Sequence, residues 1–412
     1  MSSNIVPLLN ILDQGICYGI VGLQHQHGFH LFEKHTNTIE EYQNIFNFIF
    51  LNKLLVNPTK VVIGEDVLIK WKTKELIIKA LIGMNIKVEF IFNCVGSAML
   101  MTHKSALVVK MNSLETYCIP VVHGYPEFKA LQCFNMGEDY FVNLLRNLIK
   151  QHGHIVRTDL LRKEASVFLH PRKGLTKDTD GRPVLVLDWE NERAKEFLSF
   201  SHLQRLLSIC FIQPEPTSNE MDLKEVTKST GSIKTVYKLP VYKSTLGWIV
   251  IPAYLNSRFA YCIPGWIIER IYEGWFEGNQ DSCTLADLIL SSLLKTSTDA
   301  RILAANNIII QYPYSTPIYG LIGRLNKSIK ALLPKYKELK GIAKHLNIRL
   351  FVNKIENQVE GQELDSRMSD MTINSFTLEF CGLSVLLNNP TYQAQQVYEV
   401  EEDVQNIIEW IR

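Results

Sequence analysis

The sequence predicts a mixed α/β protein in which two domains face each other across a central cleft. The chain has 412 residues and 46% hydrophobic content, so at roughly 100–200 residues per domain it can bury two or three cores. Three short strands followed by alternating helices and strands are expected from residue 5, and this order begins again near residue 106. A repeated βββαβα unit favours two similar domains, and ligands usually lie in the cleft between such domains.

The first unit has clear boundaries in the sequence. Its strands are expected at 5–12, 16–23 and 29–32. Thr38 and Glu41 form a capping box that starts the next helix, which Asn57-Pro58 ends. The remaining elements are a strand at 61–64, a helix at 72–82 closed by Gly83, and a strand at 88–92.

The second unit opens with a hairpin. Residues 106–111 form a short apolar strand and 116–122 an alternating one, so 112–115 are expected to turn between them. A third strand is expected at 130–134, followed by a helix at 139–150. Later elements are a strand at 184–188, helices at 265–276 and 285–294, a strand at 307–310 and a helix at 319–333.

Composition and charge exclude several classes of protein. The net charge of +1 does not recruit nucleic acid to the molecule as a whole. The eight cysteines are scattered singly without a CxxC pair, which favours reduced thiols in the cytosol or nucleus. The start of the chain lacks the features of a signal peptide, and no run reaches 18 apolar residues, so no membrane insertion is expected.

Three polar stretches are expected to be surface loops or linkers, partly disordered, at 158–182, 213–236 and 353–373. The last stretch, 397–411, places valines and isoleucines at helical spacing. It is expected to be a helix that docks on the first domain.

Several segments, in order along the chain, resemble actin-related proteins. They are Leu54-Leu55-Val56-Asn57-Pro58 with the following strand, the hairpin at 106–122 with Val122-His123-Gly124-Tyr125, residues 285–310, and residues 375–387. The resemblance implies an actin-like fold, a duplicated ribonuclease-H-like architecture. The first domain would comprise 1–95 and 375–412, and the second 96–374.

The chain departs from this family at the loops that would hold a nucleotide. Asp13-Gln14-Gly15 keeps an acid and one glycine of the first phosphate loop, so these residues are vestigial candidates for cofactor binding. In the second hairpin Lys110 replaces an aspartate and Asn112 a glycine. Further departures fall at Asn93, which replaces a longer glutamine that orients water, at Gln311-Tyr312-Pro313, and at Cys381-Gly382.

These departures bear on catalysis, because a misplacement of ~1 Å can cost on the order of 10²-fold in rate. A turn that holds phosphates also needs small residues so that backbone N–H groups can approach. The chain is therefore expected not to be an enzyme, with no catalytic residue, no metal and no cofactor. Binding of ATP or ADP without turnover is left open.

A second departure is a deletion. Fewer than 15 residues separate the strand ending near Leu23 from Thr38, whereas actin has a small subdomain there that the next protomer contacts. A reduced subdomain around 24–37 would let the chain join a filament by its other face and admit no successor. Heterologous contacts that do not close would otherwise extend indefinitely.

Within the family, these segments most resemble the branch at the pointed end of dynactin. The resemblance implies a structural subunit that caps the actin-like filament of dynactin, contacts other pointed-end subunits and supports dynein-based transport along microtubules. Such a protein would be a cytoplasmic, cytoskeletal hetero-oligomer component. The alternatives are a nuclear actin-related scaffold of a chromatin-remodelling complex and an active actin-fold ATPase.

Two other patterns are weighed against simpler explanations. His25, His27, His30 and His35 invite a metal site, but no cysteine or well-spaced carboxylate joins them, so a solvated turn is favoured. The lysines between 324 and 345 suggest a solvated helix face, an acidic protein partner or, less well, nucleic acid. The apolar cluster at 266–276 is expected to be core, with a protein interface as the alternative.

Overall fold

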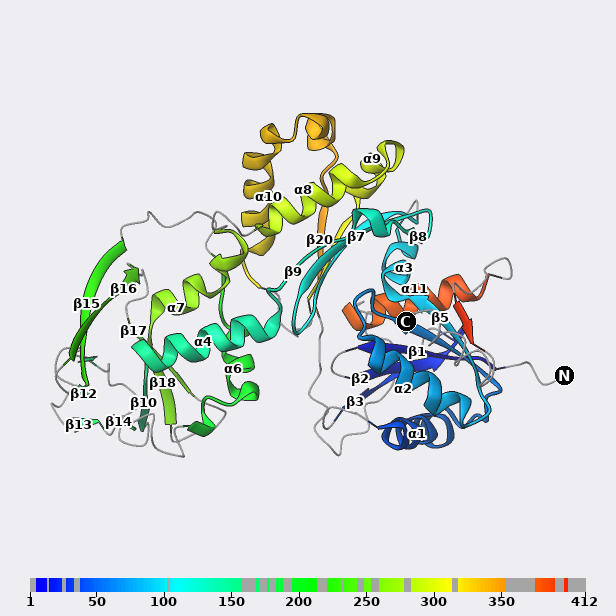
Figure 1. Ribbon diagram of the computed structural model, residues 1–412, viewed down its shortest axis with the longest axis horizontal. Helices are drawn as coiled ribbons and strands as arrows, with labels where there is room; N and C mark the ends of the chain where they lie inside the picture. Colours follow the sequence, from blue (N-terminus) through cyan, green and yellow to red (C-terminus); the bar gives the residue numbers. More distant parts are fainter. Residues whose placement is uncertain are drawn as a thin grey trace, which may run out of the picture.

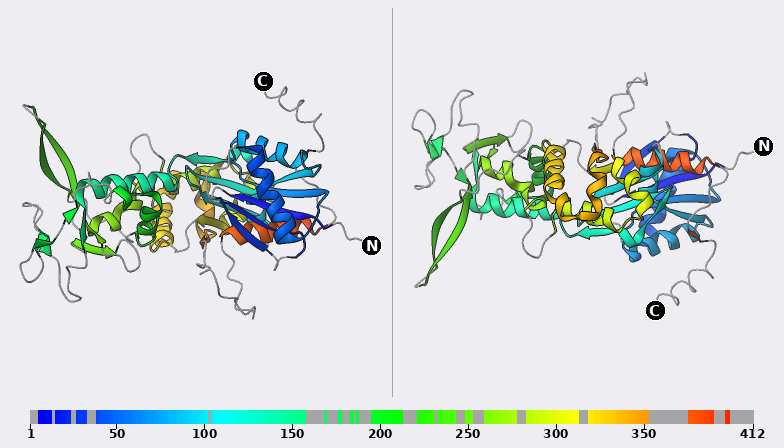
Figure 2. Two further views of the ribbon diagram at one scale, coloured as in Figure 1. Left: turned by 90° about the horizontal axis from the view of Figure 1, so that it is seen from below. Right: turned by 90° about the horizontal axis from the view of Figure 1, so that it is seen from above.

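We describe the protein from a computed structural model (Figure 1). It covers residues 5–12, 15–23, 27–32, 38–101, 104–157, 195–212, 259–277, 283–312, 318–352 and 375–389. It also covers the strand segments 168–169, 176–177, 183–184, 186–187, 221–230, 233–242, 248–252 and 396–398. The fold is mixed α/β, and its three larger sheets follow one another along the long axis of the molecule (Figures 1 and 2).

The first sheet is six-stranded in the order β21-β5-β4-β1-β2-β3. Its strands are β1 (Pro7–Leu12), β2 (Gly15–Ile20), β3 (His27–Leu31), β4 (Lys60–Glu65), β5 (Lys87–Phe92) and β21 (Gln396–Tyr398). The first three strands are antiparallel neighbours, and β4 and β5 run parallel to β1. The carboxyl ends of β1 and β4 therefore lie at the same edge of the sheet.

The second sheet repeats this plan in the order β20-β19-β6-β7-β8, with β9 also paired to β7. Its strands are β6 (Ala106–Met111), β7 (Thr116–Val122), β8 (Tyr125–Pro126), β9 (Gln132–Phe134), β19 (Ile308–Tyr312) and β20 (Ile348–Val352). Again β6 and β7 are antiparallel, and β19 and β20 run parallel to β6. In both sheets the first strand is central, flanked by its hairpin partner on one side and parallel strands on the other.

The third sheet is four-stranded in the order β14-β10-β18-β17. It consists of β10 (His154–Arg157), β14 (Val186–Leu187), β17 (Trp248–Pro252) and β18 (Phe259–Pro264). Near it lie α4 (Glu138–His152), α6 (Phe200–Leu207), α7 (Gly265–Arg270) and the 3₁₀ helix η4 (Ile271–Trp275) (Figure 1). Smaller sheets pair β11 (Phe168–Leu169), β12 (Thr176–Lys177) and β13 (Pro183–Val184), and β15 (Met221–Thr230) with β16 (Ile233–Tyr242).

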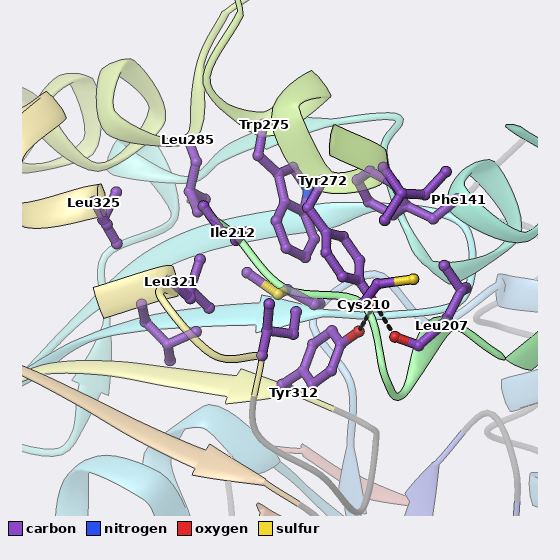
Figure 3. Packing of buried hydrophobic residues seen from close by; sticks show 14 of the residues in the cluster. Phe141, Leu207, Cys210, Ile212, Tyr272, Trp275, Leu285, Tyr312, Leu321 and Leu325 are labelled. Atoms are coloured by element: carbon purple, nitrogen blue, oxygen red, sulfur yellow. Dashed lines mark hydrogen bonds between the residues drawn. The ribbon is translucent and has the colours of Figure 1, made fainter. Parts of the chain in front are cut away.

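Helices cover the outer faces of the first two sheets. The first carries α1 (Ile39–Asn47), the π-helix η1 (Phe48–Leu54) and α2 (Trp71–Ile82) over one apolar core. The second carries α8 (Leu285–Lys295), α9 (Thr298–Asn306) and α10 (Leu321–Leu332), followed by the 3₁₀ helices η5 (Leu333–Lys335) and η6 (Lys337–Lys344). Its core includes Trp275 and Tyr272. The Tyr272 hydroxyl donates to Leu207 O and is hydrogen-bonded to the Tyr312 hydroxyl (Figure 3).

Two helices pack between the first and second sheets: α3 (Asn93–Met99) and α11 (Ser375–Leu387). Residues of both sheets and both helices form one shared apolar core there. The helices cross in backbone contact, because a Cβ on Gly382 would lie 1.8 Å from Gly96 O. Glycine at these two positions is what allows the crossing.

Most of the predicted elements are confirmed. The capping box of Thr38 and Glu41 is present, and the hairpin strands 106–111 and 116–122 have the predicted bounds. Trp266, Ile267, Ile268, Ile271 and Trp275 are core residues, at most 6% exposed. The eight cysteines are free thiols. No described helix is long and apolar enough to cross a membrane.

Two predictions are wrong where the structure describes them. Residues 396–398 form strand β21 on the edge of β5 rather than the start of a helix, because the backbone there pairs with an open strand edge. The rest of 397–411 lies outside the described residues. Within 213–236, predicted as loop, residues 221–230 and 233–236 belong to the β15–β16 hairpin, whose ladder satisfies backbone groups that a loop would leave to water. The stretch 353–373 and most of 158–182 are outside the described residues.

The helix crossing generates a test. Gly382→Ala should lower the free energy of unfolding by about 2 kcal/mol or more, because its Cβ would force α3 and α11 apart. Gly323→Ala on α10 is the matched control, since nothing lies within 4 Å of its Cβ position, and it should gain about 0.5–1 kcal/mol. Urea unfolding measures both, and a Gly382→Ala variant as stable as the control would contradict the close crossing.

Candidate functional site where the two sheets meet

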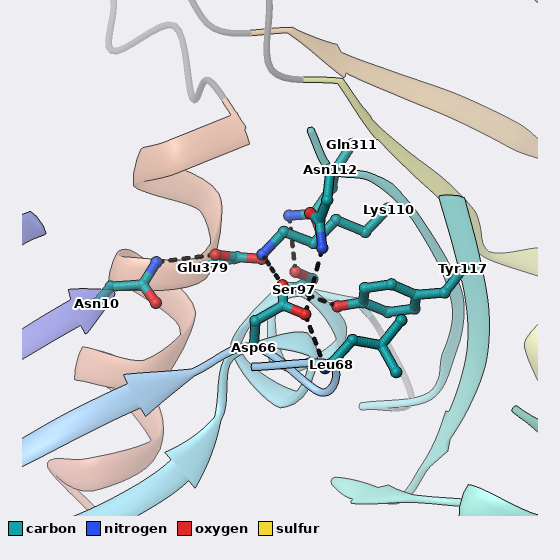
Figure 4. Close-up of polar contacts among 9 residues, drawn as sticks. All are labelled: Asn10, Asp66, Leu68, Ser97, Lys110, Asn112, Tyr117, Gln311 and Glu379. Atoms are coloured by element: carbon teal, nitrogen blue, oxygen red, sulfur yellow. Dashed lines mark hydrogen bonds and ion pairs between the residues drawn. The ribbon is translucent and has the colours of Figure 1, made fainter. Parts of the chain in front are cut away.

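The carboxyl ends of four strands from two different sheets converge on one polar cluster (Figure 4). Asn10 lies in β1 and Asp66 directly follows β4, while Lys110 lies in β6 and Gln311 in β19. The helices between the sheets add Ser97 from α3 and Glu379 from α11. Open α/β sheets place ligands outside the carboxyl ends of their strands, so this is where a ligand site is expected.

Lys110 holds the centre of the cluster. Its Nζ lies 2.8 Å from Asp66 Oδ2 and 2.8 Å from Glu379 Oε1. All three residues are largely buried, with side chains 9%, 14% and 1% exposed respectively. One cation from the second sheet therefore bridges a carboxylate of the first sheet and one of the helix pair. We call Lys110, Asp66 and Glu379 the ion bridge.

The two carboxylates of the ion bridge also accept hydrogen bonds from other groups. Asn10 donates its Nδ2 to Glu379 Oε2 at 2.8 Å. Asp66 accepts the backbone N–H of Leu68 at 3.0 Å and the Tyr117 hydroxyl at 3.2 Å, and the Asn112 amide lies 3.4 Å from it. These donors make the burial of two carboxylates beside one lysine tolerable, because buried charges need both a partner and satisfied oxygens.

The same contacts shift the pKa of both partners. Burial alone would raise the pKa of Asp66, but the charge and hydrogen bond of Lys110, with help from Leu68 and Tyr117, hold it below its ordinary value of 3.8. Burial alone would lower the pKa of Lys110, but the attraction of Asp66 and Glu379 outweighs it and raises that pKa. Both groups are therefore charged at neutral pH.

The turn of the second hairpin is engaged in capping a helix. The carbonyl oxygens of Asn112, Ser113 and Leu114 accept the N–H groups at the start of α4, from Glu138, Asp139 and Gly137 respectively. A Cβ on Gly137 would lie 2.5 Å from Asn112 O, so glycine is needed there. This turn presents carbonyl oxygens to a helix N-terminus, and that helix N-terminus is no longer free for an anion.

Two residues of the predicted departure at 311–313 are side chains of the core. Gln311 and Tyr312 belong to β19 and are 1% and 3% exposed. Gln311 donates to Ser97 Oγ at 3.0 Å, and Tyr312 contacts Tyr272. Pro313 is outside the described residues. Asn93 is fully buried at the start of α3, and neither of its side-chain polar atoms has a hydrogen-bond partner among the residues that the structure describes.

The predicted vestigial cofactor residues do not join this cluster as far as the structure describes them. Gly15 begins β2, where it is paired with Leu12 and Leu31 in the ladder. Asp13 and Gln14 lie outside the described residues. Of the substitutions noted in the sequence, Lys110, Asn112 and Gln311 are the ones that the fold brings into this cluster.

Sequence reasoning missed the partners of Lys110. Asp66 lies two residues after the strand predicted at 61–64, and Glu379 lies within the segment 375–387, but neither was predicted as a site residue. A usable signal was present: Glu379 is the single charged residue in that helix. A lone carboxylate in an apolar helix needs a buried cation, and Lys110 in an apolar strand needs a buried acid.

The histidine-rich segment gives no metal centre in the part of the chain that the structure describes, where no cluster of three or more potential ligands occurs. His27 and His30 lie in β3, and their rings contact Phe380 and Phe48 respectively, on opposite faces of the sheet. His25 and His35 are outside the described residues.

Comparison with known proteins adds no assignment, because no family model matches the chain and no curated protein matches it significantly.

Removal of the bridging cation should strongly lower the free energy of unfolding. Lys110→Met leaves Asp66 and Glu379 buried without their counter-ion, so we expect a loss of about 3–5 kcal/mol in the free energy of unfolding. Lys79→Met, which breaks the more exposed helical pair with Glu75, is the matched control and should lose under about 0.5 kcal/mol. Urea titration at neutral pH measures both, and similar losses would refute a structural role for the ion bridge.

The lowered pKa of Asp66 predicts a pH dependence with a definite sign. Its contribution to stability is fully present above its unfolded value, near 3.8, and is lost as the pH falls through the lower folded value. The difference in the free energy of unfolding between wild type and Lys110→Met should therefore narrow as the pH is lowered through 3.8, because a protonated Asp66 no longer needs a cation. Urea titrations on both sides of that pH measure this difference; one that widens in acid would show that the sign is wrong.

Proposed function

We propose that this chain is a non-catalytic structural subunit with an actin-like, ribonuclease-H-like duplicated fold, which caps the pointed end of the actin-like filament of dynactin. In this role it contacts the filament subunit and other pointed-end subunits, and it supports dynein-based transport along microtubules in the cytoplasm. The first domain comprises 1–95 and 375–412, and the second 96–374. The observation that carries the proposal is the ion bridge at the place where a nucleotide would lie.

The strand order supports the fold. Both six-stranded sheets have a central first strand with an antiparallel hairpin on one side and two parallel strands on the other. The chain returns from the second sheet through α11 and adds β21 to the first. Such a duplication, with helices packed between the halves, is what the resemblance to actin-related proteins implies.

The site supports the absence of nucleotide chemistry. Phosphates at the meeting point of the sheets would need free N–H groups and a carboxylate for Mg²⁺. Here Lys110 is paired with both carboxylates. The carbonyl groups of the hairpin turn accept hydrogen bonds from the start of α4, and the side chains of Gln311 and Tyr312 fill the space beside β19. These residues do not fit a Mg²⁺-bound triphosphate, and no catalytic step is assigned to them.

The connection after β3 supports a terminating role. β3 ends at Leu31 and α1 begins at Ile39, so the intervening residues are too few for a separate subdomain. A chain without that subdomain can add to a filament through its opposite face while offering no acceptor for the next subunit. Capping follows from such an asymmetric surface.

The proposal can be tested on filament ends. Purified protein should stop pointed-end growth of the actin-like filament at substoichiometric amounts and leave the other end growing. The Lys79→Met variant should act as wild type does, because its exposed pair lies on α2 and not in the ion bridge. Unchanged growth at both ends would refute capping.

Affinity purification separates the proposal from its rivals. We expect the filament subunit and pointed-end subunits of dynactin, and no stoichiometric ATP or ADP after acid release. Recovery of chromatin-remodelling subunits without the filament protein would replace this function with a nuclear scaffold. Bound nucleotide with measurable turnover would replace it with an ATPase.

A further inference from the structure

A ridge of lysines lies on the outer side of the second sheet. It follows α10, η5 and η6, which form the upper part of the molecule in Figure 1. Its members are all exposed: Lys327, Lys330, Lys335, Lys337, Lys340 and Lys344. We call these six residues the basic ridge. Between residues 321 and 352, Glu338 is the only carboxylate.

The cations of this segment fall into two groups. Arg324, buried on the inner side of α10, is paired with Glu273 at 3.1 Å. By contrast, five exposed lysines of the basic ridge make no ion pair with any residue that the structure describes: Lys330, Lys335, Lys337, Lys340 and Lys344. The inner charge is neutralised within the fold, and these five outer charges repel one another.

The basic ridge is held on a firm base. Leu339 and Ile342 of η6 are buried, as are Leu325 and Ile329 of α10, and all four belong to the large apolar core. The lysines therefore start from fixed backbone positions. Residues three apart eclipse one another in a 3₁₀ helix, so Lys337 and Lys340 lie on one side of η6, and Gly341 and Lys344 lie on the side next to it.

A glycine in the same helix gives an independent indication. Gly341 is exposed, and nothing lies within 4 Å of the position its Cβ would take. Glycine lowers helix stability relative to alanine, and no contact within the described fold requires it here. A flat backbone surface next to lysines permits close approach by another chain.

We infer that the basic ridge is a docking surface for an acidic segment of a partner protein. Carboxylates of such a segment would pair with Lys337, Lys340 and Lys344 while its backbone passes over Gly341. The chemistry favours a protein over nucleic acid, because the ridge carries ammonium groups without an exposed aromatic ring between residues 327 and 344 on which bases could stack. This inference is independent of filament capping.

Fluorescence anisotropy with the full chain and a short fluorescein-labelled glutamate-rich peptide tests it. Lys337→Gln/Lys340→Gln/Lys344→Gln should weaken binding at least about tenfold. Lys70→Gln/Lys72→Gln/Lys150→Gln removes the same charge from exposed sites elsewhere and should weaken it less than about twofold. Gly341→Ala should keep or raise the melting temperature and still weaken peptide binding.

Three results would overturn the inference. Equal losses of peptide affinity in the two triple variants would mean that the peptide is attracted to positive charge non-specifically. A single-stranded oligonucleotide of equal charge that binds more tightly than the peptide at the same salt concentration would assign the ridge to nucleic acid. A Gly341→Ala variant that binds the peptide as wild type does would show that the partner backbone does not pass closely over residue 341.

Discussion

The position of the first sheet relative to the second depends on the ion bridge. Lys110 extends from β6 of the second sheet, and its ammonium lies 2.8 Å from a carboxylate that follows β4 of the first. Its second partner, Glu379, belongs to a helix packed between them. Removal of this buried lysine would be strongly destabilising, because two buried carboxylates would lose their counter-ion. The bridge therefore fixes the sheets at the point where their strand ends meet.

The surrounding fold is arranged to hold that bridge in place. The helices α3 and α11 pack backbone to backbone at Gly96 and Gly382, which brings Glu379 within reach of Lys110. The turn after β6 is held by the start of α4, so the strand that carries Lys110 ends in a fixed position. Together these contacts hold the two sheets at this point through residues of the chain itself, which is why we favour a structural role.

Local patterns were sufficient for much of the fold and insufficient for the site. The capping box at Thr38 and the two hairpin strands at 106–122 are short-range signals, and the structure has them as predicted. The departure at Lys110 was also visible, but its partners Asp66 and Glu379 are 44 and 269 residues away. Such pairing depends on topology. Residues 397–398 were misassigned because their helical spacing is overridden by an available edge at β5.

A double-mutant cycle on Lys110 and Glu379 tests the central claim most directly. The free energy of unfolding is measured for wild type, Lys110→Met, Glu379→Gln and the double variant, each with and without Mg²⁺ and ATP. The account predicts a coupling of about 2 kcal/mol or more that nucleotide leaves unchanged. A coupling below about 0.5 kcal/mol, or a wild type that nucleotide stabilises, would contradict it.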